Sequence, residues 1–178
     1  FGVWDRNRQT LFMARDRLGI KPFYYTLLDN GLFLFASELK ALLVHPDFDK
    51  TFDHRAIEDY FAYGYIPEPK TIFKNAFKLN PGHLLSLQRG QQTVQSREYW
   101  DIPFTPHGSL SEEEAAEELI LRLRNAVDSH LMSEVPLGAF LSGGVDSSAV
   151  VAMMGGLMKE PVNTCSFAFS DPAFDGTQ

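Results

Sequence analysis

The sequence contains a single cysteine and no excess of positive charge, and each shortage excludes a class of protein. Its 178 residues carry 16 Lys and Arg against 23 Asp and Glu, which gives a net charge of −7. A nucleic-acid or anionic-membrane surface needs a basic stripe, so we expect neither partner. One cysteine, Cys165, excludes an internal disulfide framework and is consistent with a reducing, cytoplasmic compartment.

Long apolar runs are also missing. The longest one, Ala149–Met158, is far too short to cross a bilayer. There is no initiator methionine, and Phe1–Trp4 already has the composition of a strand. The last residues, Phe174–Gln178, contain no closing element, so we expect the chain to be a fragment. A leader segment upstream of it stays an open question.

Four short apolar runs, separated by turn signals, occupy residues 1–36. Asn30-Gly31 is a strong hairpin signal, because both residues tolerate a positive φ. The close spacing of the runs predicts one antiparallel sheet. The expected strands are Phe1–Trp4, Thr10–Ala14, Phe23–Leu28 and Leu32–Ala36.

Two helices and further strands are expected after this sheet. Ser37 provides the cap for a short helix that ends at Leu43, and a second helix covers His54–Tyr63. Tyr65–Pro69 contains two prolines, which force an extended segment. Further strands are expected over Leu84–Leu87 and Gln92–Tyr99.

The composition changes over Asp101–Ser109, where two prolines, a glycine and polar residues are typical of a linker. We therefore expect a first domain over residues 1–100, a linker over 101–110 and a second domain over 111–178.

The second domain begins with a capping box, in which Ser111 and Glu114 satisfy each other's backbone amides. A long amphipathic helix follows and ends near Leu131. A strand, a helix and another strand come next, and this order predicts a parallel sheet. Their expected bounds are Pro136–Leu141, Asp146–Met158 and Val162–Phe169.

The segment Leu141–Ser148 indicates chemistry more strongly than any other. It lies between an apolar strand and a helix, and it has the sequence Leu-Ser-Gly-Gly-Val-Asp-Ser-Ser. The small residues leave backbone amides open to a ligand, and the helix directs its unpaired N–H groups and positive dipole end to the same place. Two serine hydroxyls add donors. Together these groups predict a cradle for phosphate or pyrophosphate.

Asp146 would repel a phosphate in this cradle unless a divalent cation lay between them, so we expect it to contact Mg²⁺. The loop is not a Walker A motif, because the spacing and the lysine of that motif are missing. The simpler alternative is a tight turn in which Asp146 or Ser147 only caps the helix.

Ser142–Ser148 closely resembles the pyrophosphate loop of the ATP-pyrophosphatase superfamily, whose members cleave ATP between its α- and β-phosphates. The other segments resemble one family within it. Ala14–Tyr25, Phe35–Leu42 and Tyr63–Pro67 are similar, in order and spacing, to the later half of the glutaminase domain of asparagine synthetases. The resemblance covers essentially the whole chain. Further matching segments are Thr71–Phe73, Leu79–His83, Tyr99–Trp100 and Val135–Leu141.

The resemblance implies a fold of the α/β and α+β classes in two partial domains. The first is the second half of an N-terminal-nucleophile-hydrolase αββα sandwich, and the second is the start of a Rossmann-like parallel α/β domain. The implied reaction converts ATP, aspartate and glutamine to asparagine, glutamate, AMP and pyrophosphate through an acyl-adenylate. ATP and Mg²⁺ are the implied cofactors, and the oligomeric state, which includes a homodimer, stays open.

The resemblance also implies roles for single residues. Asp16 matches the carboxylate that holds the α-amino group of glutamine; the alternative is an ion pair with Arg15 or Arg17. Phe167 matches a position whose backbone meets adenine; the alternative is a plain core aromatic. The family usually has glycine where Ala168 stands, which predicts a tighter adenine pocket here. The implied ATP and pyrophosphate site consists of Leu141, Ser142, Gly143, Gly144, Val145, Asp146, Ser147, Ser148 and Phe167, with Asp146 as the metal ligand.

No catalytic residue is expected within these 178 residues. The nucleophile of the family is a cysteine at the mature N-terminus, which would precede Phe1. Cys165 lies in an apolar strand, where a lone cysteine usually has a packing role. The chain alone is therefore expected to be inactive. Two rivals stay open: relatives on this scaffold amidate sugars or close β-lactam rings, and a non-catalytic relative would bind ATP without turnover.

Overall fold

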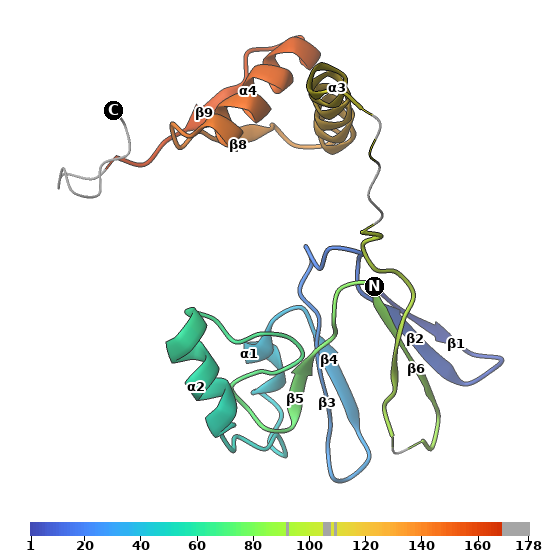
Figure 1. The fold of residues 1–178 in the computed structure, drawn as a ribbon. Helices are drawn as coiled ribbons and strands as arrows, with labels where there is room; N and C mark the ends of the chain where they lie inside the picture. The colour runs from blue at the N-terminus through green and yellow to red at the C-terminus, as the bar shows by residue number, and fades with distance from the viewer. Residues whose placement is uncertain (92, 105–107, 109, 169–178) are drawn as a thin grey trace. The chain divides into compact units, whose positions relative to one another are not determined.

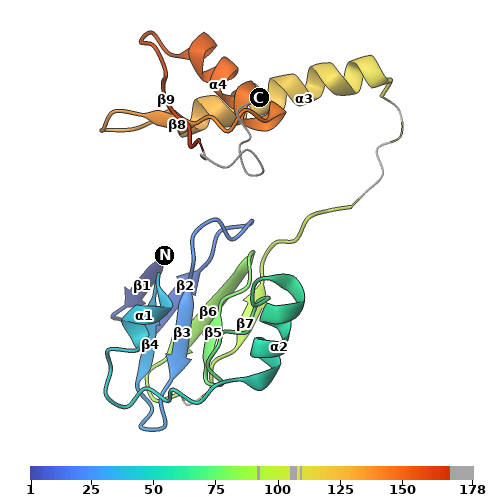
Figure 2. The same cartoon turned by 90° about the vertical axis from the view of Figure 1, so that its left-hand side faces the viewer.

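The computed structural model describes residues 1–91, 93–104, 108 and 110–168. It divides into two compact units, Phe1–Phe104 (unit 1) and Thr105–Gln178 (unit 2) (Figure 1, Figure 2). Sheets and helices occur in both units, as the expected mixed α/β class requires. Part of the expected linker and the end of the expected strand Val162–Phe169 lie outside the described residues.

Unit 1 contains two antiparallel sheets, with the strand orders β1-β2-β6-β7 and β4-β3-β5. The prediction of one sheet for the first four strands is therefore wrong. β1 pairs with β2 and β3 pairs with β4, but each hairpin joins a different sheet because the chain crosses over between β2 and β3. The strands are β1 Gly2–Asp5, β2 Thr10–Ala14, β3 Tyr24–Leu27, β4 Phe33–Ala36, β5 Ala76–Lys78, β6 His83–Gln88 and β7 Ser96–Glu98.

The main core of unit 1 lies between the two sheets. Met13 of β2 and Leu85 of β6 are fully buried, and they pack with Phe23 and Leu79 from the chain next to β3 and β5. Burial alternates along the strands, so that Ser86, which follows Leu85, is exposed. The sheets therefore bury one face each against the other.

Two helices, α1 (Leu39–Leu42) and α2 (His54–Tyr63), lie on the side of the β4-β3-β5 sheet away from β1 and β2 (Figure 1). Leu42 of α1 packs with Phe48, from the segment between the two helices, and with Ala76 of β5. The expected cap at Ser37 is wrong, because α1 begins too late; Glu38 is its N-cap and makes no side-chain cap. The bounds of α2 match the prediction, and its cap is the carboxylate of Asp53.

Unit 2 confirms the predicted strand–helix–strand order. α3 (Glu112–His130) begins with the expected capping box, in which the Ser111 hydroxyl accepts from the Glu114 amide and the Glu114 carboxylate accepts from the Ser111 amide. β8 (Gly138–Phe140) and β9 (Asn163–Cys165) pair in parallel, and α4 (Val145–Leu157) connects them. Within the described part of the chain, no helix combines the length and the apolar character needed to cross a membrane.

Cys165 does not have the packing role that its sequence context predicts. Its side chain is exposed, as are the other residues of β9. The strand pairs only with β8 among the described residues, and Asn163, Thr164 and Cys165 are all exposed.

The sheet-to-sheet core can be tested at Leu85. We expect Leu85→Ala to lower the free energy of unfolding by about 2–5 kcal/mol, because it leaves a cavity between the sheets. The neighbouring exposed Ser86→Ala is the matched control and should change it by less than about 0.5 kcal/mol. Urea unfolding followed by fluorescence reports on unit 1, since both tryptophans, Trp4 and Trp100, belong to it. Equal effects of the two substitutions would contradict a core at this position.

Candidate functional sites

Asp16 lies in the loop between β2 and β3, at the point where the chain leaves the first sheet. Its two carboxylate oxygens accept hydrogen bonds from the backbone amides of Ile20 (2.8 Å) and Lys21 (3.0 Å). The alternative ion pair with a neighbouring arginine is not formed in the described structure. Arg15 pairs with Glu68 instead, and the guanidinium of Arg17 lies over the ring of Trp100.

The charge of Asp16 is stabilised by its own loop. Burial by itself raises the pKa of this carboxyl, but the hydrogen bonds from the amides of Lys21 and Ile20 outweigh it and hold the pKa below its ordinary value. Each carboxylate oxygen has a second lone pair to offer. Asp16 is therefore a fixed anion that can still accept from an ammonium group.

A hollow of about 300 Å³ lies beside Asp16. Phe23 and Tyr99 contribute its aromatic walls, and Lys21 and Pro22 lie on the same loop as the carboxylate. The Tyr99 hydroxyl donates to the backbone carbonyl of Arg15 (2.7 Å), which fixes this wall to the strand that leads into the loop. The arrangement suits a small ligand with a cationic end.

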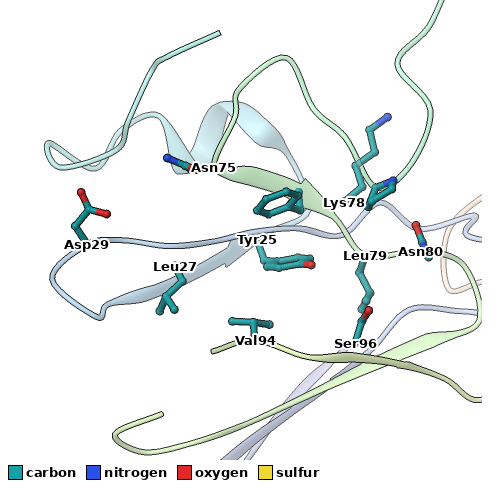
Figure 3. Close-up of a pocket in the computed structure, with 11 residues that line it drawn as sticks. Tyr25, Leu27, Asp29, Asn75, Lys78, Leu79, Asn80, Val94 and Ser96 are labelled. Atoms are coloured by element: carbon teal, nitrogen blue, oxygen red, sulfur yellow. The ribbon is translucent and has the colours of Figure 1, made fainter. Parts of the chain in front are cut away.

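A larger cavity of about 500 Å³ lies elsewhere in unit 1 (Figure 3). Tyr25, Leu79 and Val94 surround its centre, with Asp29 at one end and Ser96 towards the other (Figure 3). The ring of Tyr25 also packs against Phe77, with centroids 5.8 Å apart. Burial raises the pKa of the Tyr25 phenol, so the hydroxyl stays protonated at neutral pH. None of the residues expected to bind a ligand lines this cavity.

In unit 2 the segment Leu141–Ser148 leads from β8 into α4. Gly143 has φ +84°, a conformation that favours glycine, and Gly144 is the N-cap of α4. No side chain caps this helix, so the alternative in which Asp146 or Ser147 serves only as a cap is wrong. The first amides of α4 are therefore left for a ligand.

Three serine hydroxyls gather around this helix terminus. Ser147 and Ser148 both donate to the carbonyl of Gly144, at 3.1 and 2.8 Å. The hydroxyl of Ser142 lies 3.0 Å from that of Ser147, and the amide of Ser142 donates to Ser147. Ser166, beyond β9, donates to the carbonyl of Leu141 (2.6 Å) and ties the two strand ends together. The hydroxyl hydrogens of Ser147 and Ser148 are therefore engaged within the loop, and the donors that it offers to phosphate oxygens are the backbone amides of the first turn of α4.

Asp146 lies in the first turn of α4 and is exposed. The described residues contain no cluster of three or more acidic, histidine or cysteine side chains that could hold a metal ion by themselves. A single carboxylate fits Mg²⁺ nevertheless, because this ion is usually held by one or two carboxylates together with substrate phosphates and water.

Phe167 is not a core aromatic in the described structure. Its side chain is 72% exposed and stacks on Phe140, with ring centroids 5.8 Å apart. This finding removes the alternative role. Contact between its backbone and adenine stays a prediction.

The sequence indicated no role for Tyr99, and for Arg15 only that of an alternative ion-pair partner of Asp16. Both line the hollow beside Asp16, and Arg15 is buried although it is charged. The only indication in the sequence of a role for Arg15 is its position at a strand end, directly before Asp16, the residue predicted to bind glutamine. A charged residue there is usually expected to face solvent.

Two family models match the chain, one in unit 1 and one in unit 2. A family model described as glutamine amidotransferase domain matches residues 1–100, and one described as asparagine synthase matches residues 118–178.

Individual relatives match across both units. A Bacillus subtilis protein named asparagine synthetase (glutamine-hydrolyzing) 3 is 38% identical over 176 residues, which are 96% of this chain and 28% of the relative. A Methanocaldococcus jannaschii protein named putative asparagine synthetase (glutamine-hydrolyzing) 2 is 40% identical over 86% of this chain and 30% of the relative. A Penicillium rubens protein named amidase chyE is 37% identical over 90% of this chain and 23% of its own length. The chain therefore spans less than a third of each of these relatives.

The charge of Asp16 can be tested through stability. Because its folded-state pKa is lowered, the charged carboxylate stabilises the fold above the unfolded-state pKa, and this contribution is lost as the pH falls through the lower folded-state value. We expect Asp16→Asn to lower the free energy of unfolding clearly at pH 7 and less at about pH 3. Urea unfolding of both proteins at the two pH values measures this difference. A loss that does not depend on pH would show that the amides do not stabilise the charge.

Proposed function

This chain belongs to the glutamine amidotransferase domain family, with the start of an asparagine synthase unit behind it, and we propose that the complete protein is an ATP-dependent, glutamine-hydrolysing asparagine synthetase. The observation that carries the proposal is that one chain contains two sites of opposite electrostatic character, one suited to a cation and one suited to an anion. Unit 1 holds a fixed carboxylate beside a hollow, and unit 2 presents an uncapped helix terminus lined with hydroxyls.

Unit 1 would bind glutamine. The carboxylate of Asp16 accepts from the α-ammonium of the substrate, and the aromatic walls of the hollow enclose its carbon chain. Hydrolysis of the side-chain amide consumes water and releases glutamate and ammonia. The nucleophile is proposed to be a cysteine of the complete protein that precedes Phe1, in the N-terminal-nucleophile-hydrolase sandwich to which these two sheets would belong.

Unit 2 would bind ATP in a Rossmann-like domain of which β8, α4 and β9 form the start. The backbone amides at the start of α4 hold phosphate oxygens, and the backbone near Phe167 meets adenine. A bound Mg²⁺, held by Asp146, would neutralise phosphate charge. An aspartate carboxylate oxygen attacks the α-phosphorus and pyrophosphate leaves. Ammonia then attacks the acyl carbon of the adenylate, and AMP leaves with the former carboxylate oxygen.

The two activities benefit from being in one protein. Ammonia released into water at neutral pH becomes ammonium, which is no nucleophile. Direct delivery to a protected adenylate keeps ammonia neutral and near its target. We therefore assign glutamine, aspartate and ATP to the complete protein as substrates.

A second candidate function keeps this mechanism and changes the acceptor. Relatives that match this chain include proteins named amidase as well as asparagine synthetase. The described residues include the proposed glutamine and phosphate contacts but none that we assign to an acceptor. An acid other than aspartate that drives AMP formation in the complete protein would favour this candidate, and binding of ATP without any AMP formation would favour a non-catalytic relative.

The two-site assignment predicts that the activities separate on mutation of the complete protein. Asp16→Asn should reduce glutamine hydrolysis about 10- to 100-fold, because it removes a charge-assisted contact, and should spare ammonia-driven AMP formation. Asp146→Asn should reduce ammonia-driven AMP formation by a similar factor and spare glutamine hydrolysis. Glutamate and AMP are measured separately in each variant.

Asp128→Asn, an exposed aspartate on α3, is the matched control and should leave both rates unchanged. If either Asp16→Asn or Asp146→Asn abolished both activities to the same extent, the assignment of separate sites would be wrong.

A further inference from the structure

Arg15 is a buried cation in unit 1. Only 7% of its surface is exposed, and its guanidinium donates to three backbone carbonyls. Nε donates to Lys21 (3.0 Å), Nη1 to Leu79 (2.6 Å) and Nη2 to Gly19 (2.8 Å). Among the described residues no buried side-chain donor is left without a partner. Two of the three carbonyls belong to the loop that holds Asp16.

One peptide group connects the guanidinium of Arg15 to the carboxylate of Asp16. The carbonyl of Gly19 accepts from Arg15, and the amide of Ile20, in the same peptide plane, donates to Asp16. Because the plane is rigid and its C=O and N–H point in opposite directions, the two contacts fix each other's orientation. Lys21 adds a second link, since its carbonyl accepts from Arg15 and its amide donates to Asp16.

The loop passes very close to the guanidinium at Gly19. This residue has φ +67°, and a Cβ atom there would lie 3.0 Å from Nη2 of Arg15 and 2.7 Å from Pro81. Glycine allows both the conformation and the close approach.

The charge of Arg15 is balanced by a residue other than Asp16. Glu68 lies 3.5 Å from Nη1, and it is partly buried. Asp16 therefore supports no direct ion pair with Arg15 and keeps its free lone pairs for a ligand in the hollow.

From these contacts we propose that Arg15 is a positioning residue: through the peptide group between Gly19 and Ile20 it holds Asp16 in the orientation that recognises the α-ammonium of glutamine. The inference rests on the proposed glutaminase function of unit 1. Lysine cannot replace Arg15 in this role, because a single ammonium does not reproduce the planar fork that donates to Gly19 and Lys21 together.

The test compares Arg15→Lys with the wild type in the complete protein. Two substrates are hydrolysed, glutamine and glutaramate, which has the same amide and terminal carboxylate but no α-amino group. We expect the KM for glutamine to rise about 10-fold or more, while the rate with glutaramate changes little. The preference for glutamine therefore falls by the same factor. Arg8→Lys, whose side chain is 85% exposed, is the matched control and should keep the wild-type preference.

The ratio of the two substrates separates positioning from general damage. A parallel loss with both substrates, or a preference equal to that of the wild type, would overturn the proposal. If Arg15→Lys shows no cooperative urea transition, Gly19→Ala replaces it, because it disturbs the same peptide group while leaving the arginine in place. The same selective loss is expected, and a parallel loss would again overturn the proposal.

A double-mutant cycle tests the link without relying on activity. If Arg15 acts on Asp16, Asp16→Asn should shift the urea midpoint about twofold less in the Arg15→Lys background than in the wild type. Additive shifts would overturn the link. If the wild-type complete protein hydrolyses no glutamine, the proposed function fails, and the cycle still decides whether Arg15 holds Asp16.

Discussion

A single guanidinium, buried where the chain crosses from one sheet of unit 1 to the other, determines much of what surrounds it. A buried charged group is tolerated only when its N–H donors have hydrogen-bond acceptors and its charge has a partner of opposite sign. The fold must therefore bring carbonyl groups and a carboxylate to Arg15. The carbonyls of Gly19, Lys21 and Leu79 and the side chain of Glu68 do so. The shape of the loop follows from these contacts, and the orientation of Asp16 follows from the loop.

The two units use opposite electrostatics. In unit 1 the backbone amides of Ile20 and Lys21 donate to the carboxylate of Asp16, which is thereby fixed as a negative charge that can bind a cationic group. In unit 2 the helix α4 has no side-chain cap, so that its amides are left for an anion. A protein that takes nitrogen from an amino acid and activates a carboxylate with ATP needs both kinds of site. This correspondence is the physical reason for joining them in one proposal.

Features that depend on local sequence could be predicted. The bounds of α2, the capping box at Ser111 and the parallel pair formed by β8 and β9 follow from caps, periodicity and element order, and the structure confirms them. The pairing of the first strands was not predictable in the same way. β2 pairs with β1 on one side but with the distant β6 on the other, and only packing between the sheets decides that choice.

In the candidate sites, too, the features that depend on local sequence could be predicted and those that depend on distant residues could not. The proposed phosphate cradle could be inferred from the sequence, because small residues between a strand and a helix are typical of phosphate-binding loops. The position of Arg15 was not, because its burial depends on carbonyls and a carboxylate that lie far along the chain, at Leu79 and Glu68. The exposure of Cys165 could not be predicted for a related reason, since it depends on which elements cover β9 rather than on the residues next to Cys165 in the sequence.

The central claim is that nitrogen from glutamine reaches an acid activated by ATP. Its most direct test incubates the complete protein with Mg-ATP, aspartate and glutamine whose amide nitrogen carries the heavy isotope, and analyses all products by mass spectrometry. The account predicts asparagine that carries the heavy nitrogen in its amide, with AMP and pyrophosphate in matching amounts. Formation of ADP and phosphate, or the absence of ATP cleavage with every acid tested, would contradict it.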